Sequence, residues 1–393
     1  MLKTGDKNCD IMDKALIILL MKFNCKFCFM GGGGIMMYLA SIGDLKEGDI
    51  LAKKIYTADG KLLLGAGRRL NKKYINKLEK IGINHIYLKD DRLKELKKED
   101  IEIIPEEIRK EAIIIARDCI KKISDADIGL KGGEQHQLYK VIADIIDNIT
   151  INRKLLNCIK DIRLLQDELF FHLTNVTVLS LVVAKQLGYE RERLMELGIG
   201  AFLHDVGKIK VPPEILNKPG RLTDEEFEEV KKHTTYGYQI LTNIKGIPEV
   251  SARIAYLHHE RCDGSGYPKG ISRRYIDEYA RIVAIADVFD SMINDRVYRS
   301  SIKVKEVIEY LYTTFTENKM DRQLLDKFLR MVVPYPIGTK VKLNIGCEAV
   351  VTQVNETMKL RPVVKVLNFI GLDRDFVIDL SKDLHIDIVD EIV

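Results

Sequence analysis

Residues 194–208 read LMELGIGAFLHDVGK, an apolar stretch that ends in the adjacent pair His204-Asp205 and in Gly207-Lys208. The apolar pattern predicts a buried helix over Leu194–Val206. A buried carboxylate beside an imidazole is costly unless a cation or hydrogen-bond donors offset its desolvation. The stretch therefore predicts a helical domain with a polar site in its core.

Further residues of metal-ligating types lie on both sides of this pair. Eight candidates fall between positions 168 and 287, and they include five of the eight histidines of the chain: Glu168, His172, His204, Asp205, His233, His258, His259 and Asp287. Imidazoles mixed with carboxylates suit iron, manganese, zinc or nickel, whereas structural zinc usually recruits cysteine. This ligand set predicts a hydrolase.

Taken singly, several of these residues have ordinary explanations. Glu168 and His172 are four residues apart and share a helix face, but this is also the spacing of a surface contact. Asp287 lies in the apolar run RIVAIADVF, where a backbone amide or an arginine could also satisfy it. His233 follows the charged helix predicted over Thr223–Lys232, which starts with a capping box. An exposed histidine is therefore the default expectation at position 233.

The adjacent pair His258-His259 carries more information. It follows the apolar helix predicted over Ile254–Leu257 and precedes a Gly/Pro-containing loop that ends at Pro268. Neighbouring residues on a helix diverge by about 100°. Both rings can therefore bind only if metals lie on more than one side or if the helix end unwinds. The pair favours a metal cluster over a single ion.

With these residues in this order, the sequence resembles the HD-GYP family, the cyclic-di-GMP phosphodiesterase branch of the HD phosphohydrolases. The resemblance covers about Asp167 to Leu311 and follows the family's order of motifs. The matching residues are HDxGK at His204–Lys208, HHExxDGxGYP at His258–Pro268, ILNKPG at Ile215–Gly220, His233, Asp287, and DRxYR at Asp295–Arg299.

The resemblance implies roles for single positions. The implied metal ligands are His172, His204, Asp205, His233, His258, His259 and Asp287. Asp205 would bridge two ions, and Glu168 matches the extra glutamate of members that hold a third. The implied cofactors are thus two or three divalent ions, iron or manganese. Lys208 would neutralise phosphate charge, and Arg296 and Arg299 would hold the phosphates, although surface salt bridges are the ordinary alternative for both arginines.

The activity that the resemblance implies is hydrolysis of cyclic-di-GMP to linear pGpG and onward to GMP, by attack of a metal-bridging hydroxide. Two alternatives stay open. One is an HD-GYP hydrolase of another cyclic dinucleotide, such as cyclic GMP-AMP. The other is a non-catalytic cyclic-di-GMP receptor that signals through a partner protein. A homodimer is a further expectation.

The chain of 393 residues is longer than one core usually fills. We expect a multidomain protein with a central all-α HD-type helical domain, a small α/β module before it and a small β-rich region after it. The expected boundaries are 1–36 (an extension), 37–90 (α/β module), 91–137 (charged linker and helix), 138–333 (HD-GYP domain) and 334–393 (β-rich). Because four glycines, Gly31–Gly34, precede Met36 and Met37, we hypothesise that synthesis starts at one of these methionines.

Local patterns predict the elements around the central domain. The α/β module is expected to contain a hairpin around Asp59-Gly60 and a helix that begins at an Asn cap. The expected elements are strands Ile50–Tyr56, Lys61–Leu64 and Ile83–Leu88; helices Asn71–Lys80, Pro105–Ile123 and Leu138–Leu165; and strands Lys340–Leu343, Glu348–Gln353, Pro362–Leu367 and Asp375–Ile378.

Composition limits the classes of partner. The net charge of +4 gives no argument for binding a nucleic-acid polymer. Seven scattered cysteines are typical of reduced thiols, and no stretch reaches the roughly eighteen uninterrupted apolar residues of a membrane helix. We therefore expect a cytoplasmic protein without a membrane partner.

Overall fold

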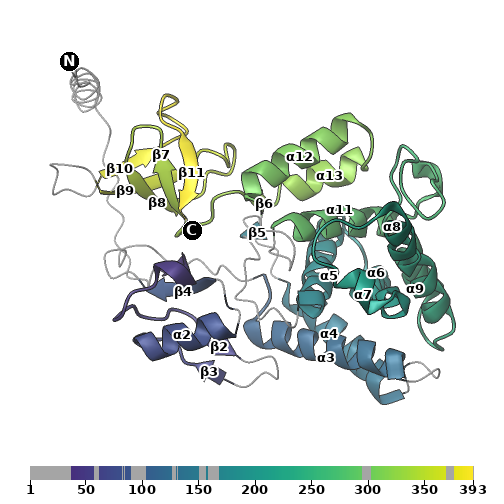
Figure 1. The fold of residues 1–393 in the computed structure, drawn as a ribbon. Coiled ribbons are helices and arrows are strands. Elements are labelled where there is room, and N and C mark those ends of the chain that lie inside the picture. The colour runs from purple at the N-terminus through teal and green to yellow at the C-terminus, as the bar shows by residue number, and fades with distance from the viewer. Residues whose placement is uncertain are drawn as a thin grey trace, which may run out of the picture. The chain divides into compact units, whose positions relative to one another are not determined.

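The computed structural model of the chain describes residues 37–56, 62–81, 83, 85–89, 103–125, 130, 132–149, 156–157, 168–293, 302–368 and 376–392. The chain divides into two compact units. One comprises Leu39–Leu88 and Asp100–Pro336, and the other includes Ile337–Val393. The expected fold class is confirmed: a mostly helical centre, a small α/β region before it and a β-sheet after it (Figure 1). The finer five-part division stays a prediction.

The small α/β region contains two short two-stranded sheets. Its elements are β1 (Met37–Ser41), η1 (Ile42–Asp44), β2 (Ile55–Tyr56), β3 (Leu62–Leu64), α2 (Lys72–Lys80) and β4 (His85–Lys89). β2 pairs antiparallel with β3, as the hairpin pattern predicts, although Asp59 and Gly60 lie outside the described residues. The Asn71 side chain caps α2 by accepting from the Tyr74 amide, which confirms the predicted start of that helix.

The single strand predicted over Ile50–Tyr56 is wrong. Ile50 and Leu51 form isolated bridges to Arg69 and Leu88, and regular pairing begins only at Ile55. The backbone here changes partner from one residue to the next, since Leu51 donates to the Arg68 carbonyl whereas the next amide donates to β4. An apolar run does not reveal such a switch.

The helical region places α5 and α6 between α3 and α4 on one side and α11 on the other (Figure 1). Its elements are α3 (Glu106–Asp125), α4 (Gly132–Asn148), β5 (Leu156–Asn157), α5 (Glu168–Gln186), α6 (Arg191–Leu203), η4 (Val206–Lys210), α7 (Pro213–Leu216), α8 (Asp224–Lys231), α9 (His233–Thr242), α10 (Glu249–Leu257), η5 (Arg273–Tyr275), α11 (Glu278–Ile293), α12 (Val304–Thr316), α13 (Arg322–Leu329) and β6 (Val332–Val333). α5 is apolar on nearly all sides and is buried accordingly.

The helix predicted over Leu138–Leu165 is wrong at both ends. α4 starts earlier, at Gly132, and stops at Asn148. Leu156 and Asn157 instead form the short strand β5, which pairs in parallel with β6. That partner lies far along the sequence, so a local periodicity cannot indicate it.

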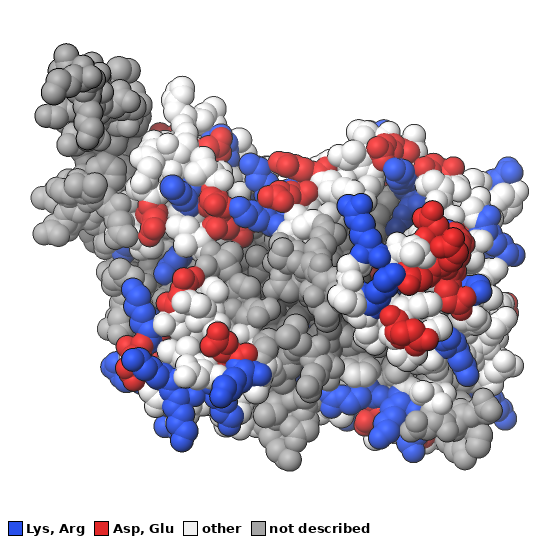
Figure 2. Space-filling view, viewed as in Figure 1, with Lys and Arg blue, Asp and Glu red and all other residues white. Residues whose placement is uncertain are grey.

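α8 forms an acidic exposed face of the helical region. Figure 2 shows acidic side chains gathered over this helix, and Asp224, Glu225 and Glu228 are exposed. The predicted capping box is confirmed: Thr223 accepts from the Glu226 amide, and the Glu226 carboxylate accepts from the Thr223 amide. The capping box therefore fixes where α8 begins, and the helix ends at Lys231, shortly before His233.

The C-terminal unit is a five-stranded antiparallel sheet in the order β10-β9-β8-β7-β11. Its strands are β7 (Lys340–Leu343), β8 (Glu348–Gln353), β9 (Val363–Asn368), β10 (Phe376–Asp379) and β11 (Ile388–Ile392). β7 and β8 match the predicted strands, and β9 and β10 start one residue later than predicted. The prediction omitted β11, an edge strand in which only Ile388 is buried, so it lacks an apolar pattern.

Two features of the described residues bear on membranes and redox state. Among them, the segment Leu169–Gln186 is long and apolar enough to cross a membrane, but it is the mostly buried core helix α5. Cys119, Cys262 and Cys347 are free thiols. Location in the cytoplasm stays a prediction.

Candidate metal centre

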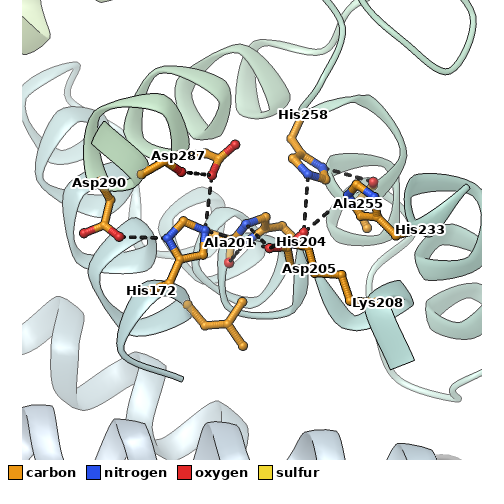
Figure 3. A network of polar contacts seen from close by, with 12 residues as sticks. His172, Ala201, His204, Asp205, Lys208, His233, Ala255, His258, Asp287 and Asp290 are labelled. Carbon is orange, nitrogen blue, oxygen red and sulfur yellow. Dashed lines mark hydrogen bonds and ion pairs between the residues drawn. The ribbon is translucent and has the colours of Figure 1, made fainter. Parts of the chain in front are cut away.

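Side chains from five segments of the helical region converge on one buried site (Figure 3). α5 supplies His172, the end of α6 supplies His204 and Asp205, α9 begins with His233, α10 ends at His258-His259, and α11 supplies Asp287. All are buried except His259, whose side chain is 19% exposed. They form two groups, each with candidate ligand atoms within 4.8 Å of one another: Asp205, His233, His258 and His259; and His172, His204 and Asp287.

Asp205 belongs to the first group, but its carboxylate also faces the second group. Its Oδ1 is 3.3 Å from His233 Nε2 and 3.9 Å from His258 Nε2. Its Oδ2 is 3.5 Å from His204 Nε2 and 3.8 Å from His172 Nε2. Each carboxylate oxygen thus faces imidazoles of a different group, which is the arrangement that a ligand shared between two ions requires.

The histidine tautomers follow from the hydrogen bonds at Nδ1. A backbone carbonyl oxygen can only accept a hydrogen bond. In three rings Nδ1 lies at hydrogen-bond distance from such an oxygen: His204 from Ala201 at 2.7 Å, His233 from Val230 at 2.6 Å, and His258 from Ala255 at 3.0 Å. Nδ1 therefore carries the proton in each ring, and Nε2 presents a lone pair. His172 is oriented differently, because its Nδ1 lies 2.7 Å from Asp290 Oδ2.

The inward-facing atoms of the site have no hydrogen-bond partner within the protein. These atoms are Nε2 of His172, His204, His233 and His258 and Oδ1 of Asp205. Buried polar atoms are nearly always satisfied, and a cluster of imidazole and carboxylate atoms is the donor set that divalent transition metals prefer. The residues present therefore fit a site for divalent metal ions.

Burial sets the protonation of most of the rings. It lowers the pKa of four of them: His204, His233, His259 and His258, the last to about 3. These rings are neutral at pH 7 and ready to bind a cation. For His172, burial opposes the charged form, but the carboxylates of Asp287 and Asp290 on either side of the ring outweigh it and raise the pKa.

The two carboxylates of the site stay ionised. Burial alone would raise the pKa of Asp205, but the nearby Lys208 ammonium and the imidazoles around it hold that pKa well below its usual range. The pKa of Asp287 is likewise far below its usual value, because His172 outweighs the effect of burial. Asp287 also accepts from the Ser291 hydroxyl at 3.2 Å. The alternative in which an arginine or a backbone amide satisfies Asp287 is not what the described contacts show.

Lys208 reaches the edge of the same site. Its Nζ lies 2.5 Å from Asp205 Oδ2, and its side chain is 26% exposed. The 3-10 turn η4 brings the lysine back over the carboxylate three residues earlier. A cation at the rim of the site is placed to neutralise an incoming phosphate.

The expectation of an exposed His233 is wrong. The side chain is 1% exposed, because the chain turns at Lys232 and α9 starts at the histidine. Gly207 makes this approach possible: a Cβ there would lie 1.9 Å from the His233 carbonyl oxygen. Only glycine allows η4 and α9 to pack so closely.

The adjacent rings of His258 and His259 are explained by the end of α10. The helix stops at Leu257, and both histidines lie beyond it in the same candidate ligand group. Their ring centroids are 4.1 Å apart at an interplanar angle of 44°. Both rings thus reach one candidate ligand group from the end of the helix, and whether ions lie on more than one side of the pair stays a prediction.

The loop after this pair covers the site with an aromatic ring. Tyr267 stacks on His259 with centroids 4.7 Å apart at 30°, and Phe227 packs edge-on against the same tyrosine. Gly266 is required because a Cβ would lie 2.3 Å from the Arg261 amide nitrogen. A glycine at this position therefore permits the tight backbone geometry of the loop.

Sequence reasoning assigned no role to two carboxylates that organise the site. The buried Glu260 accepts from the Lys269 amide at 2.7 Å and the Ile271 amide at 3.1 Å, which fastens the loop that carries Tyr267. Asp290 orients His172. A signal for Asp290 was present, since it lies about one helical turn after Asp287 and directly follows the same apolar run.

Three predicted residues are not placed at the site by the structure. Glu168 is the first residue of α5, but its side chain lies outside what the structure describes. Arg296 and Arg299 fall in the undescribed segment 294–301. The roles expected of all three stay predictions.

Comparison with known proteins agrees with the motifs. Residues 157–324 match the family model described as "HD domain". The chain contains an HD domain. The resemblance inferred from the HDxGK and GYP strings is thereby confirmed, and the site described above lies within the matched HD domain.

Several curated proteins are similar to this chain. The cyclic di-GMP phosphodiesterase PA4108 of Pseudomonas aeruginosa is 31% identical over 271 residues, covering 67% of this chain and 64% of the relative. A cyclic di-GMP phosphodiesterase of Thermotoga maritima is 39% identical over 161 residues, with 41% and 44% covered. The 3′3′-cGAMP-specific phosphodiesterase 1 of Vibrio cholerae is 37% identical over 161 residues, with 41% and 37% covered. The chain thus spans less than two thirds of the length of each.

A solved structure supports the fold. Bd1817, described as an HDG"Y"P protein from Bdellovibrio bacteriovorus, matches with a TM-score of 0.50 at 19% identity, covering 74% of this chain and 98% of that one. At this identity the match concerns the fold around the HD domain alone.

Proposed function

We propose that this protein is a metal-dependent phosphodiesterase that hydrolyses cyclic-di-GMP to linear pGpG and onward to GMP. The observation that carries the proposal is the position of Asp205, whose two oxygens face imidazoles of two separate groups of candidate ligands. The relatives with the same domain are named as cyclic-di-GMP or cyclic GMP-AMP phosphodiesterases, which supports a cyclic dinucleotide as substrate.

Seven side chains would hold the ions: His172, His204, Asp205, His233, His258, His259 and Asp287. When bound, the ions supply a water of lowered pKa and positive charge for the phosphate. The donor types suit iron or manganese, and Glu168, at the start of α5, would be the ligand that adds a third ion.

The residues of the chain position the phosphodiester for in-line displacement. Water oxygen bonds to phosphorus, the bond from phosphorus to the ribose 3′-oxygen breaks, and that oxygen takes up a proton. Lys208, at the rim of the site, would neutralise charge on the non-bridging oxygens. Arg296 and Arg299 would hold the second phosphate. Tyr267 and its neighbour Phe227 form an aromatic wall against which the ligand would lie.

The test is an assay of protein purified without oxygen and supplied with Mn²⁺ or Fe²⁺. Incubation with cyclic-di-GMP and chromatography of the products should yield pGpG or GMP. Tight binding without product would favour the receptor alternative, and neither binding nor turnover would contradict cyclic-di-GMP as the ligand.

A second cyclic dinucleotide is tested in the same assay, because relatives specific for cyclic GMP-AMP share the domain. Competition between the two substrates measures the preference as a ratio of kcat/KM. Faster hydrolysis of cyclic GMP-AMP would replace the substrate and leave the reaction class unchanged.

The third ion is tested with Glu168→Ala. If Glu168 holds it, the variant should slow conversion of pGpG to GMP more than ring opening. Equal effects on both steps would count against a third ion. We also propose that the protein acts in the cytoplasm, forms a homodimer and contacts a signalling partner protein.

A further inference from the structure

The buried carboxylate of Asp290 connects one candidate ligand to residues outside the ligand set. Asp290 is 1% exposed and lies on α11, three residues after Asp287. The two carboxylates flank the His172 ring, with Asp287 Oδ1 3.2 Å from Nε2 and Asp290 Oδ2 2.7 Å from Nδ1 (Figure 3). The orientation of this ring therefore depends on a side chain from a different helix.

His172 differs in this respect from the other rings described above. His204, His233 and His258 each direct Nδ1 at a carbonyl three residues earlier, within their own local backbone. His172 lies inside α5, where Asp290 supplies the acceptor instead. A carboxylate acceptor makes the opposite ring nitrogen more basic than a carbonyl does. The ligand strength of His172 is thus set from outside its own helix.

Asp290 also contacts Asn175. Asn175 lies on the same face of α5 as His172, three residues on, and its Nδ2 donates to Asp290 Oδ1 at 2.9 Å. Asn175 Oδ1 in turn accepts from an Arg109 guanidinium nitrogen at 3.0 Å. Arginine is only a donor, so Arg109 holds the asparagine with its oxygen outward and its amino group toward Asp290.

Arg109 lies in the first turns of α3, which precedes the matched HD domain in the sequence. Without the guanidinium, the Asn175 amide is free to rotate and present its oxygen to the carboxylate of Asp290. Two acceptors would then face each other, and Asp290 would lose a donor that holds it against His172.

We propose that Arg109 and Asn175 are positioning residues for the metal pocket of His172, His204 and Asp287, and that they act through Asp290. The helix α3 thereby contributes to the affinity of one ion without touching it. A change in the position of α3 would weaken that ion selectively. This inference rests on the proposed metal centre.

The test measures Mn²⁺ binding to the full chain by calorimetry and elemental analysis. Arg109→Gln and Asn175→Ala should raise the dissociation constant of one ion about 10-fold, as is typical for outer partners of metal ligands, and leave the other ion unchanged. Arg109→Lys keeps a donor and should restore part of the loss. Lys122→Gln is the matched control on α3, because that lysine is exposed and pairs only at 3.8 Å with Glu134.

A double-mutant cycle shows whether the effect passes through His172. In a His172→Ala background, Arg109→Gln should cause no further change in Mn²⁺ affinity. In a His233→Ala background, the 10-fold effect should persist. An equal effect in both backgrounds, or weakening of every ion together with a lower melting temperature, would overturn the proposal in favour of a merely structural role for Arg109.

The two proposals fail in different ways. A wild-type chain that binds no divalent ion would contradict the metal centre itself. A wild-type chain that binds two or more ions, with unchanged affinities in Arg109→Gln and Asn175→Ala, would overturn only the positioning role.

Discussion

Four of the histidines at the centre of this protein, His172, His204, His233 and His258, each have Nδ1 at hydrogen-bond distance from a fixed oxygen, and this contact decides what the other ring nitrogen can do. For His204 and His233 the acceptor is a carbonyl of the preceding turn. The proton is held at Nδ1, and Nε2 is left facing the carboxylate of Asp205. Local helix geometry thus prepares these lone pairs before any ligand arrives.

At the scale of the residue, the role of Lys208 is directly testable. Lys208→Met removes the ammonium 2.5 Å from Asp205 Oδ2 but keeps a side chain of similar length. Because a charge that stabilises the transition state is lost, kcat for cyclic-di-GMP hydrolysis should fall about 100-fold. Metal content should stay that of the wild type.

The control for this variant is Lys210→Met, which removes an exposed lysine from the same 3-10 turn. It should retain wild-type kcat. Loss of metal in Lys208→Met would instead mean that the lysine supports the fold of the site and does not act on phosphate.

At the scale of the element, close packing of η4 against α9 holds Asp205 and His233 together. Gly207→Ala would place a Cβ 1.9 Å from the His233 carbonyl oxygen and 2.4 Å from the Gly237 amide nitrogen. Both are backbone atoms, so the elements must separate. We expect a loss of about 3 kcal/mol in the free energy of unfolding, measured by denaturant titration, and weaker metal binding.

Gly132→Ala is the matched control for that substitution. Gly132 begins α4, and a Cβ there meets no heavy atom within 4 Å. Its free energy of unfolding should change little. Equal stabilities of the two variants would contradict the packing argument at Gly207.

The helix α13 depends on the carboxylate of Asp321. Asp321 caps α13 by accepting from the Gln323 and Leu324 amides, and it also accepts from Arg273 at 2.8 Å and from Arg281. It is 3% exposed. Asp321 therefore ties the helix to the segment that follows the GYP loop. Asp321→Asn should cost about 3 kcal/mol at pH 7, because the largely buried Arg281 guanidinium loses its charged partner.

The pH dependence of that loss has a definite sign. Burial raises the pKa of Asp321, but the hydrogen bonds from Arg273 and the Leu324 amide and the charge of Arg281 outweigh it, so the pKa is lowered. A carboxyl group whose pKa is lower in the folded state than in the unfolded state stabilises the fold at pH values above its unfolded-state pKa of about 3.9. This stabilisation is lost as the pH falls through the folded-state pKa. The difference between wild type and Asp321→Asn should therefore be full at pH 7 and shrink below about pH 4.

Asp326, whose side chain is 48% exposed, provides the control for Asp321, since it pairs with Arg330 at 2.9 Å. Asp326→Asn should change the unfolding free energy by less than about 1 kcal/mol. A loss at Asp321 that does not depend on pH would contradict the electrostatic explanation.

At the scale of the whole molecule, the metal centre joins five helices that are distant in sequence. The candidate ligands come from α5, α6, α9, α10 and α11 or from their ends. Ions that bind only the folded state stabilise it by about 2.7 kcal/mol at a hundred times their dissociation constant. A chelator should therefore lower the melting temperature of the helical unit by several degrees, as followed by circular dichroism at helical wavelengths.

The Asp205→Ala variant is the control for chelation, because it lacks the carboxylate that faces both ligand groups. Its melting temperature should not respond to a chelator or to added Mn²⁺, and its hydrolysis should be abolished. A chelator effect of the same size in this variant would place the stabilising ion elsewhere.

Much of the architecture was determined by local sequence. The apolar residues of β7 and β8 predicted those strands, and the caps at Asn71 and Thr223 predicted where α2 and α8 begin. Local signals suffice there, because period and capping depend on residues a few positions apart. The ordered HD and GYP motifs likewise identified the domain and its candidate ligands before any contact was known.

Tertiary structure decided what depends on distant partners. The pairing of β5 with β6, the burial of His233 behind Gly207, and the contact of Asp290 with His172 each join segments that the sequence keeps apart. A sequence shows which side chains are able to bind a metal or accept a proton. The packing of the helices decides which atom of each of these side chains faces the site, because only packing removes water from these groups and sets the partner of each ring nitrogen.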